Sequence, residues 1–569
     1  MPYNLLGKQV RGRFGFPSGV ISTNSDTARW MIKNIPQIGF FVGKSTTIDP
    51  KEGNPEDIFI QPDAESGCNA VGYANPGLKE MLEEFKLLKQ SVPDDVFLMP
   101  QIGECDEERF AHCVREFNSL GDSIDGIELN ISCPHAQRGG ILIGSDPDIV
   151  KSIVSACRKE TEKPLIVKVN AGVPKLIEVC RAAVEAGADA ISAINTLGGP
   201  RPELSNEYGG LSGPKIFPIA FETVKMIKSE MLKSDINVPM IVMGGISSAD
   251  DIRKLDDIDR SLFYAIGTSL AEMNSKQIKE YFHQLNLDLR NNTNFAVGLT
   301  KNKKALQYNS FVVKEITDHG DSLKIIKFHQ NLPSGIGQYV FLKVGNKNSK
   351  PFSVASDKDH LEIEVRKVGE TTSKIFDLKK NSVVRIRGPY GSSFSFPDNS
   401  TVVFVGAGCG IAPIHHAAQH HDGKKIFVIG ARNKDELVYI DEMRQMGDLV
   451  VATDDGSAGF KGFVSQILEK YLHEKRINDV IFFNCGPEIA MKEVDRIEKS
   501  VTKPDKIYHL IERMTSCGVG ICGKCSINNG LRACIDGPIF TAENFTPGEY
   551  KRDKSGKRVD SNDRSTCPS

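Results

Sequence analysis

Four cysteines near the end of the chain have a spacing typical of an iron–sulfur cluster. Cys517, Cys522, Cys525 and Cys534 are separated by four, two and eight residues, with glycines between the first three. The first two gaps match the plant-type arrangement of a 2Fe–2S cluster. A structural zinc site also uses four thiolates, but it favours paired gaps of two residues. The spacing therefore predicts a 2Fe–2S cluster, with zinc as the alternative.

Polar residues in the first half of the chain stand at the ends of apolar segments. Asn130 lies near the end of the segment 125–132, and its amide could bind a planar heterocycle. Cys133 follows in a loop, where an accessible thiolate could act as a general base; a buried structural cysteine is the alternative. Lys168 is a lone lysine in the apolar segment 164–170, where an unpaired ammonium group is costly, so we expect it to face an anion. A reduced flavin is such an anion.

Further candidate groups follow later strands of the same half. Asn195 and Thr196 end the next apolar segment and add an amide and a hydroxyl group. Glycine-rich segments follow at 209–214, 244–247 and 266–270. Such loops commonly bind a phosphate group through backbone N–H donors, although each one alone resembles an ordinary turn.

The second half of the chain contains motifs typical of flavin and nicotinamide nucleotide binding. The glycines of 406–414 follow an apolar segment and precede a helical one, which lets the backbone approach a pyrophosphate closely. Segments that suit a flavin-binding barrel are found at 350–356, 364–372 and 387–394. Each motif alone could be an ordinary strand or turn. The prediction therefore depends on all of them occurring together and in this order, with further matching segments at 430–439, 454–464 and 484–494.

The elements that must position these residues follow from the hydrophobic pattern. Apolar segments alternate with helix-like ones across residues 1–300. This alternation predicts an α/β fold, a (β/α)8 TIM barrel with its functional residues at the carboxyl ends of the strands; a doubly wound open sheet is the alternative. Residues 305–396 have the short β-rich segments of a small antiparallel β-barrel, and an α/β pattern returns from 401.

Composition excludes several classes of protein. The 569 residues are 40% hydrophobic and 25% charged, so collagen, coiled coil and disorder are excluded for most of the chain. The net charge of −2 indicates neither a nucleic-acid nor a membrane partner, and no apolar run is long enough to span a bilayer. The 13 cysteines are an odd number and mostly scattered, and the N-terminus has no signal-peptide pattern, which favours a cytoplasmic protein.

Residues 1–300 resemble the dihydroorotate dehydrogenases, specifically the cytosolic class with an active-site cysteine. The matching segments are 43–55, 69–77, 128–134, 167–170, 194–196, 208–214 and the glycine pairs after the later strands. Four residues depart from the family pattern without removing a group that the chemistry needs: Pro17, Val71, Tyr73 and His135.

This resemblance implies bound FMN, a dihydroorotate site and a catalytic base. The implied FMN-binding residues are Ser18, Lys44, Ser45, Asn130, Lys168, Ile194, Gly213, Gly244, Gly245, Gly267 and Thr268. The implied substrate-binding residues are Lys44, Asn69, Ala70, Val71, Gly72, Tyr73, Asn130, Asn195 and Thr196. Cys133 is the implied base, and Lys168 is implied to stabilise the flavin anion.

The second half resembles the ferredoxin–NADP reductase superfamily, most closely the electron-transfer subunit that partners dihydroorotate dehydrogenase. The implied FAD-binding residues are Lys350, Pro351, Phe352, Ser353, Glu364, Val365, Arg366, Thr371 and Thr372. The implied NAD-binding residues are Gly406, Gly408, Gly410, Cys485 and Gly486. Lys350 stands where the family usually has arginine, so the charge is kept but the bidentate fork is lost.

The two resemblances together imply five regions in one chain. We expect an FMN-binding TIM barrel at 1–300, an FAD-binding β-barrel at 305–396, an NAD-binding α/β domain at 397–508 and a 2Fe–2S domain at 509–546. A charged tail with few large apolar residues, 547–569, is expected to be disordered.

The implied activity is oxidation of (S)-dihydroorotate to orotate in de novo pyrimidine synthesis. Electrons would pass from FMN through the 2Fe–2S cluster and FAD to NAD⁺, because flavins convert between two-electron and one-electron transfer. The resemblance also implies a homo-oligomer formed through the barrel. Two alternatives are a dihydropyrimidine dehydrogenase that acts on uracil or thymine, and a redox module that serves an external partner.

Overall fold

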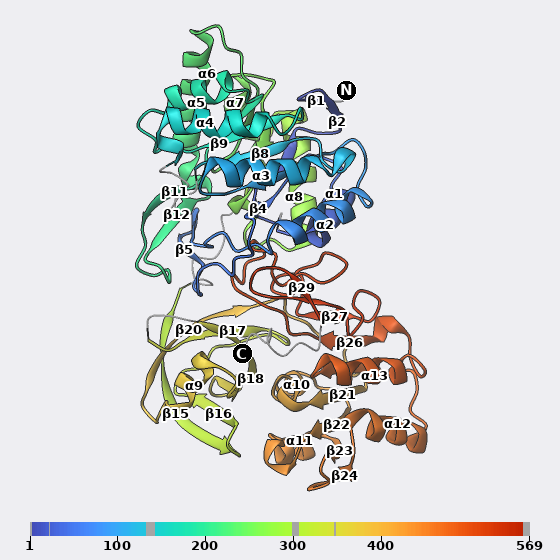
Figure 1. Ribbon diagram of the computed structural model, residues 1–569. Helices are drawn as coiled ribbons and strands as arrows, with labels where there is room; N and C mark the ends of the chain where they lie inside the picture. The colour runs from blue at the N-terminus through green and yellow to red at the C-terminus, as the bar shows by residue number, and fades with distance from the viewer. Residues whose placement is uncertain (1–2, 22, 133–142, 299–306, 346–348, 561–569) are drawn as a thin grey trace. The chain divides into compact units, whose positions relative to one another are not determined.

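The computed structural model describes residues 3–21, 23–132, 143–298, 307–345 and 349–560 (Figure 1). The chain divides into two compact units. The first consists of residues 1–303 together with 519–526 and 553–557, and the second contains the rest of the chain. The short segment 519–526, which lies inside the predicted iron–sulfur region, thus belongs to the first unit.

The first unit is built on a closed barrel of parallel strands. In sequence order the strands are β3 (Phe14–Phe16), β4 (Ile38–Thr46), β7 (Phe97–Ile102), β8 (Ile127–Asn130), β9 (Leu165–Val169), β10 (Ala190–Ala193), β13 (Met240–Val242) and β14 (Phe263–Ala265). Each strand pairs with the next in the sequence, and β14 pairs with β3 to close the circle. The prediction of a TIM barrel is confirmed, and the alternative of an open sheet is wrong.

Helices lie outside this barrel (Figure 1). They are α1 (Ser25–Asn34), α2 (Leu78–Lys89), α3 (Glu107–Asn118), α4 (Pro147–Arg158), α5 (Leu176–Glu185), α6 (Phe217–Leu232), α7 (Ala249–Asp256) and α8 (Ser275–Asn291). Consecutive helices pack against one another, and α8 packs against α1. Each presents an apolar face to a buried core that fills the layer between helices and strands.

A small antiparallel sheet that the sequence did not predict adds to the first unit. Its strands are β5 (Phe59–Asp63), β6 (Ser66–Asn69), β11 (Leu197–Pro200) and β12 (Tyr208–Ser212), in the order β11-β12-β6-β5. A short hairpin, β1 (Tyr3–Leu5) with β2 (Lys8–Val10), precedes the barrel. The antiparallel sheet joins the segment after β4 to the segment after β10, and both segments carry predicted site residues.

The second unit begins with a closed antiparallel barrel, as predicted. Its strands are β15 (Asn309–His319), β16 (Leu323–Phe328), β17 (Tyr339–Lys343), β18 (Lys350–Ser356), β19 (Glu362–Arg366) and β20 (Val383–Tyr390). Their order around the barrel is β15-β16-β19-β18-β17-β20. One helix, α9 (Glu370–Phe376), lies between β19 and β20 in the described sequence.

The second unit also contains a seven-stranded sheet, in the order β24-β23-β22-β21-β25-β26-β27. Parallel pairing joins β21 (Val402–Ala407), β22 (Lys425–Ala431), β23 (Asp448–Thr453), β24 (Phe460–Lys461), β25 (Ile481–Cys485) and β26 (Ile507–Leu510), and β27 (Ile539–Thr541) is antiparallel. The helices are α10 (Ile411–Gln419), α11 (Ile440–Met446), α12 (Val464–Lys475) and α13 (Glu488–Glu498). The predicted return to an α/β pattern after 401 is confirmed.

The expectation of a disordered tail is wrong for its first part. Residues 551–559 contain a hairpin of β28 (Lys551–Arg552) and β29 (Arg558–Val559). The Asp553 carboxylate closes the turn by accepting hydrogen bonds from the backbone N–H groups of Ser555 and Gly556, at 2.9 and 3.0 Å. An acidic side chain that accepts hydrogen bonds from nearby backbone N–H groups can stabilise a turn that has no apolar core. Composition alone does not reveal such hydrogen bonds. Residues 561–569 lie outside the described residues.

No helix in the part of the chain that the structure describes is both long enough and apolar enough to cross a bilayer.

Candidate active site and cofactor sites

Most of the residues predicted to bind FMN and substrate lie at the carboxyl ends of the barrel strands, whereas Gly213 and Asn69–Tyr73 lie at the ends of strands of the antiparallel sheet. Lys44 and Ser45 lie at the end of β4. Asn130 is the last residue of β8, and Lys168 lies near the end of β9; all four side chains are buried. Parallel strands end at one rim, so residues from distant parts of the sequence share it. Residues that follow β3, β10, β13 and β14 complete the rim: Ser18, Ile194, Asn195, Thr196, Gly244, Gly245, Gly267 and Thr268.

Beneath this rim lies a buried polar network that the sequence analysis missed. Glu128 on β8 accepts a hydrogen bond from Ser192 Oγ at 2.7 Å and another from Gln101 Nε2 on β7. Gln101 Oε1 in turn accepts from Asn130 Nδ2 at 3.1 Å and from Ser45 Oγ. Gln101 is the only polar side chain of β7, and Glu128 is a charged residue between two apolar residues of β8, which is the signal that could have identified them.

The network determines which way the Asn130 amide points. A carboxylate only accepts hydrogen bonds, so Gln101 turns its NH₂ group toward Glu128 and its carbonyl oxygen toward Asn130. The Asn130 oxygen then faces Asn195 Nδ2, at 3.4 Å, and the backbone N–H of Ser132, at 3.3 Å. Glu128 is therefore a positioning residue for an amide that is predicted to contact both FMN and substrate.

Replacing Glu128 with leucine is expected to destabilise the barrel and to weaken FMN retention, whereas Glu128→Gln should be tolerated. Leucine removes the acceptor of Gln101 Nε2 and of Ser192 Oγ, at a cost of about 1–3 kcal/mol for each buried polar group. Glutamine can accept from Gln101 and donate to Ser192, because a hydroxyl group does both. Thermal unfolding and FMN content measure the difference, and equal values for the two variants would contradict this role.

Asn195 and Thr196 are held at the same rim by contacts with neighbouring strand ends. Asn195 Nδ2 donates to the Ser132 carbonyl oxygen at 3.2 Å and lies 3.1 Å from Ser132 Oγ. Asn195 Oδ1 accepts from the Thr196 N–H at 2.8 Å, and Asn170 Nδ2 donates to the Thr196 carbonyl oxygen at 2.8 Å. These contacts bring together residues that follow β8, β9 and β10, as the predicted substrate site requires.

The glycine loop after β13 has a backbone conformation that other residues rarely adopt. Gly244 and Gly245 have φ values of +113° and +84°. A Cβ at Gly245 would lie 2.6 Å from the Phe217 nitrogen and 2.7 Å from the Gly213 carbonyl oxygen, so a side chain does not fit. The loop after β14 is tied to β12, because Thr268 Oγ1 lies 2.9 Å from Ser212 Oγ. These tight loops at the strand ends suit the phosphate group of FMN.

The loop predicted to contact substrate, Asn69–Tyr73, begins at the end of β6. Asn69 Nδ2 donates to the Gly210 carbonyl oxygen on β12 at 3.3 Å. Asn54 Nδ2 donates to the carbonyl oxygen of Ala70 at 2.8 Å. The loop is therefore held from both sides, by the antiparallel sheet and by the segment that follows β4.

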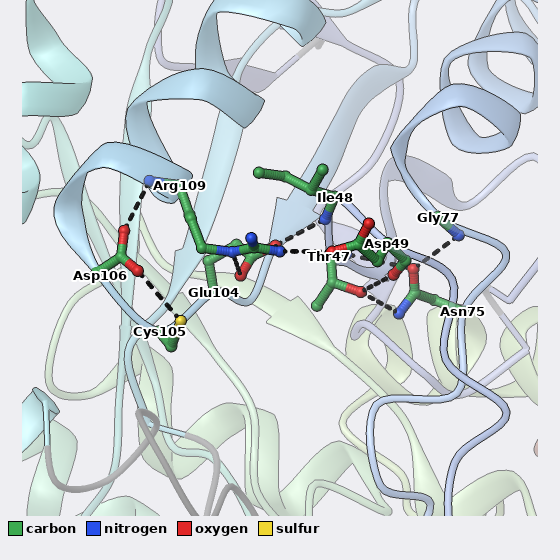
Figure 2. A network of polar contacts seen from close by, with 9 residues as sticks. All are labelled: Thr47, Ile48, Asp49, Asn75, Gly77, Glu104, Cys105, Asp106 and Arg109. Atoms are coloured by element: carbon green, nitrogen blue, oxygen red, sulfur yellow. Dashed lines mark hydrogen bonds and ion pairs between the residues drawn. The ribbon is translucent and has the colours of Figure 1, made fainter.

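A buried asparagine anchors the far end of this loop, and Figure 2 shows its contacts with Thr47 and Gly77. Asn75 Nδ2 donates to the Tyr73 carbonyl oxygen at 2.7 Å and to Thr47 Oγ1 at 2.9 Å. Asn75 Oδ1 accepts from the backbone N–H groups of Thr47 and Gly77, at 3.2 and 3.0 Å. Thr47 follows Lys44 by three residues in the sequence. The network thus couples the predicted substrate loop to the strand that carries Lys44.

An ion-pair group extends the same network toward α3 (Figure 2). Arg109 pairs with Glu104, Nε to Oε2 at 2.8 Å, and with Asp49, Nη2 to Oδ2 at 3.0 Å. Hydrogen bonds to Glu104 and then to Asp49 raise the pKa of Arg109. Glu104 Oε1 also accepts from the Ile48 N–H at 2.7 Å. The loop after β7 is therefore fixed to the loop after β4.

Cys133, the predicted base, lies outside the described residues, as does the whole segment 133–142. The residues just before it are described. Asn130 and Ser132 are buried at the rim, and Ser132 contacts Asn195. The chain therefore enters the segment that carries Cys133 from within the predicted substrate site.

The predicted FAD residues lie on two adjacent strands and one helix of the second unit. Lys350, Pro351, Phe352 and Ser353 belong to β18, Glu364, Val365 and Arg366 to β19, and Thr371 and Thr372 to α9. β18 and β19 pair in antiparallel fashion. The ammonium group and hydroxyl groups in this set are suitable donors for a diphosphate.

The surroundings of Glu364 and Arg366 change the charge that these two residues present. Burial raises the pKa of Glu364 to about 7, so this carboxyl group is partly neutral near neutral pH. Arg366 Nη2 lies 3.3 Å from Glu436 Oε2, and Arg432 also pairs with Glu436. Part of the positive charge of Arg366 is therefore balanced by Glu436.

The predicted NAD residues surround the turn between β21 and α10. A Cβ at Gly410 would lie 2.1 Å from the Cys485 carbonyl oxygen, so glycine allows this turn to pack directly against the end of β25. Burial, and then the nearby Cys409, raise the pKa of the Cys485 thiol well above its usual range, so this thiol stays neutral. The structure thus provides a packing reason for Gly410 in addition to the predicted approach of a pyrophosphate.

The four cluster cysteines are all buried. Cys522 and Cys525 lie in the segment 519–526, which packs on the barrel within the first unit. The Ile21 N–H donates to the Ile521 carbonyl oxygen at 2.8 Å, and Asn24 Nδ2 donates to the Gly523 carbonyl oxygen at 2.9 Å. Four buried thiols within eighteen residues of sequence fit a cluster bound by thiolates.

Comparison with family models gives matches in both halves of the chain. A model described as dihydroorotate dehydrogenase matches residues 1–286. An oxidoreductase NAD-binding domain matches residues 404–496. The iron–sulfur cluster binding domain of dihydroorotate dehydrogenase B matches residues 512–546.

Individual proteins similar to this chain are of two kinds. A probable dihydroorotate dehydrogenase B (NAD(+)) electron transfer subunit from Methanocaldococcus jannaschii is 35% identical, over 43% of this chain and 96% of that protein. A dihydroorotate dehydrogenase B (NAD(+)) catalytic subunit from Pelobacter propionicus is 34% identical, over 44% of this chain and 81% of that protein. A solved structure of an NADH-dependent reduced ferredoxin-NADP oxidoreductase matches with 27% identity and a TM-score of 0.38, over 41% of this chain and 88% of that one.

The dehydrogenase match covers the half of the sequence that forms the barrel and its rim of lysine, asparagine and glycine residues. The nucleotide-binding sheet and the cysteine cluster coincide with the other two family matches. The chain therefore belongs to the dihydroorotate dehydrogenase family, and it unites in one polypeptide regions similar to the catalytic and the electron-transfer subunits of the B type.

Proposed function

We propose that this protein oxidises (S)-dihydroorotate to orotate with NAD⁺ as the final electron acceptor, in de novo pyrimidine synthesis. The observation that carries the proposal is that one chain contains the dehydrogenase barrel, the NAD-binding domain and the dihydroorotate dehydrogenase B iron–sulfur domain. When bound, FMN supplies a hydride acceptor, and the 2Fe–2S cluster and FAD supply an electron path to NAD⁺.

The residues at the barrel rim have distinct proposed roles. Lys44, Asn69, Asn130 and Asn195 bind the carboxylate and ring groups of dihydroorotate through their ammonium and amide groups. Cys133 removes the proton from substrate C5, which requires the thiolate form. The buried Lys168 ammonium group stabilises negative charge on the flavin. Ala70, Val71, Gly72, Tyr73 and Thr196 complete the proposed substrate contacts.

The proposed roles in the second unit concern electron delivery. Lys350 and Ser353 hold the FAD diphosphate, and the neighbouring residues of β18, β19 and α9 complete the flavin site. Gly406, Gly408, Gly410, Cys485 and Gly486 form the NAD site, with Cys517, Cys522, Cys525 and Cys534 as cluster ligands. We further propose a cytoplasmic homo-oligomer that forms through the barrel. The resemblance supports the oligomer, and the scattered cysteines support a reducing compartment.

Anaerobic titration with dihydroorotate tests the proposed reaction. We expect dihydroorotate to bleach the flavin absorbance and, with NAD⁺ present, to produce NADH in proportion to the substrate added. Dihydrouracil at the same concentration should do neither. Faster turnover of dihydrouracil would favour a dihydropyrimidine dehydrogenase. A purified protein without FMN would instead favour a redox module that serves an external partner.

A further inference from the structure

A compact cluster of metal-binding side chains lies in the second unit and has no role in the proposed reaction. Asp357 directly follows β18, His416 lies on α10, and His420 is the C-terminal cap of that helix. Asp357 and His416 are 6% and 1% exposed. The His420 side chain is 39% exposed, so the cluster can be reached from solvent.

The ligand atoms of these three residues are close enough to share one ion. His416 Nε2 lies 3.3 Å from Asp357 Oδ1, and His420 Nε2 lies 2.8 Å from the same oxygen. All three atoms lie within 4.8 Å of one another. Tetrahedral zinc with ligand bonds of about 2.0–2.1 Å places neighbouring ligands roughly 3.3 Å apart. The two separations from Asp357 Oδ1, 3.3 and 2.8 Å, are therefore close to those of a zinc site.

The local structure also preorganises the cluster. Two histidines four residues apart lie on one face of a helix, which is the spacing used by helical zinc motifs. Asp357 Oδ2 accepts from the Ser334 N–H at 2.6 Å and lies 3.1 Å from Ser334 Oγ. These bonds to one oxygen orient the carboxylate so that the other, Oδ1, faces the histidines. Hydrogen bonds of this kind, just outside the ligand set, are typical of metal-binding carboxylates.

We propose that Asp357, His416 and His420 bind one Zn²⁺ ion, with water as the fourth ligand. Two imidazoles and a carboxylate are ligands that zinc prefers, and a site with three protein ligands leaves room for a water molecule. Zinc is not redox-active, so the ion takes no electrons from the flavins or the cluster. Its proposed role is to hold β18 and α10 together, with the fourth position open to water as in zinc sites that have three protein ligands.

The ion would join two parts of the second unit that already contact each other. Asp357 directly follows β18, which carries some of the predicted FAD residues, whereas His416 lies on α10, the helix after the predicted NAD loop, and His420 caps the C-terminal end of that helix. His415 Nδ1 lies 2.9 Å from the Ala355 carbonyl oxygen, and Ser356 Oγ donates to Gln419 Oε1 at 3.0 Å. An ion that binds only the folded arrangement stabilises this junction between β18 and α10.

Zinc content of the untagged full-length holoenzyme tests the site. The protein is treated with a chelator, incubated with ZnCl₂ and desalted, and zinc and iron are then measured together. We expect one zinc per chain in the wild type and in His473→Gln, a control for an exposed histidine on α12. His420→Gln should weaken zinc binding by more than the roughly 10–100-fold that loss of an outer-shell partner costs. Iron content should be equal in all three, which excludes zinc at the cluster cysteines.

Thermal unfolding and a second variant complete the test. Added zinc should raise the melting temperature of the wild type and leave that of His420→Gln unchanged. Asp357→Asn should also lose zinc, and FAD absorbance in each variant reports whether the second unit is folded. Zinc content that is the same in wild type and His420→Gln, whether one per chain or none, overturns the proposal. In that case the three side chains form only hydrogen bonds between strand and helix.

Discussion

Replacing Cys133 with alanine is expected to slow reduction of the flavin by dihydroorotate by roughly 10²–10⁴-fold, the usual contribution of a positioned proton acceptor. Substrate binding should weaken far less, because Lys44, Asn69 and Asn195 are unchanged. Stopped-flow absorbance at the flavin band, with saturating substrate and no oxygen, measures the rate. An alanine variant that bleaches the flavin as fast as the wild type would remove Cys133 from the mechanism.

The pH dependence of the same step gives a sharper test of Cys133. An ordinary thiol ionises near pH ~8.5, and only the thiolate can accept the substrate proton. The wild-type rate should therefore rise toward alkaline pH and level off once the thiolate dominates. Cys133→Ser should lose this plateau, since a serine hydroxyl does not ionise between pH ~6 and ~10. A plateau at the same pH in the serine variant would assign the titration to another group.

Replacing Cys522 with serine is expected to abolish NAD⁺ reduction while dihydroorotate still bleaches the FMN. Cys522 is a predicted cluster ligand and is not among the residues at the barrel rim. Its segment contacts the barrel at Asn24, the N-cap of α1, which is not one of the predicted substrate or FMN residues, so we expect the substrate site to stay intact when the cluster is lost. Anaerobic flavin bleaching and NADH formation, followed in the same sample, separate the two half-reactions.

A matched control for this variant is Cys105→Ser, which changes an exposed cysteine outside the cluster. It should retain both half-reactions. Continued flavin bleaching in Cys522→Ser shows that the barrel is folded, which matters because metal ligands also stabilise the segment that carries them. Normal NAD⁺ reduction by Cys522→Ser would contradict the proposed electron path.

Much of the fold and of the rim followed from local sequence patterns. The alternation of apolar and helical segments predicted the TIM barrel, and polar residues at strand ends predicted part of its rim, including Asn130 and Lys168, whereas Lys44 followed only from the family resemblance. The cysteine spacing predicted the iron–sulfur region that the family model matches. These signals succeed because each depends on residues close together in the sequence, where period and spacing directly reflect a strand, a helix or a loop.

Other features depend on contacts that no local pattern reveals. Glu128 and Ser192 hydrogen-bond across 64 residues of sequence, and they meet because the barrel aligns β8, β9 and β10. Asn75 links the substrate loop to β4 only once the chain has turned back on itself. The sheet of β5, β6, β11 and β12 likewise pairs segments that are distant in the sequence. Composition indicated a disordered tail, but hydrogen bonds from backbone N–H groups to the Asp553 carboxylate form the turn of a hairpin there.

The sequence by itself determined which chemical groups this protein carries and which kind of element holds each one. It specified the cluster cysteines, the lone lysine at a strand end and the glycine loops, because those depend on residue type and short spacing. Only the tertiary structure decided which groups become neighbours, such as Glu128 beneath Asn130 or Asp357 beside His416 and His420. The physical reason is that contacts between distant segments depend on strand order, register and barrel closure, which are set by packing of the whole chain.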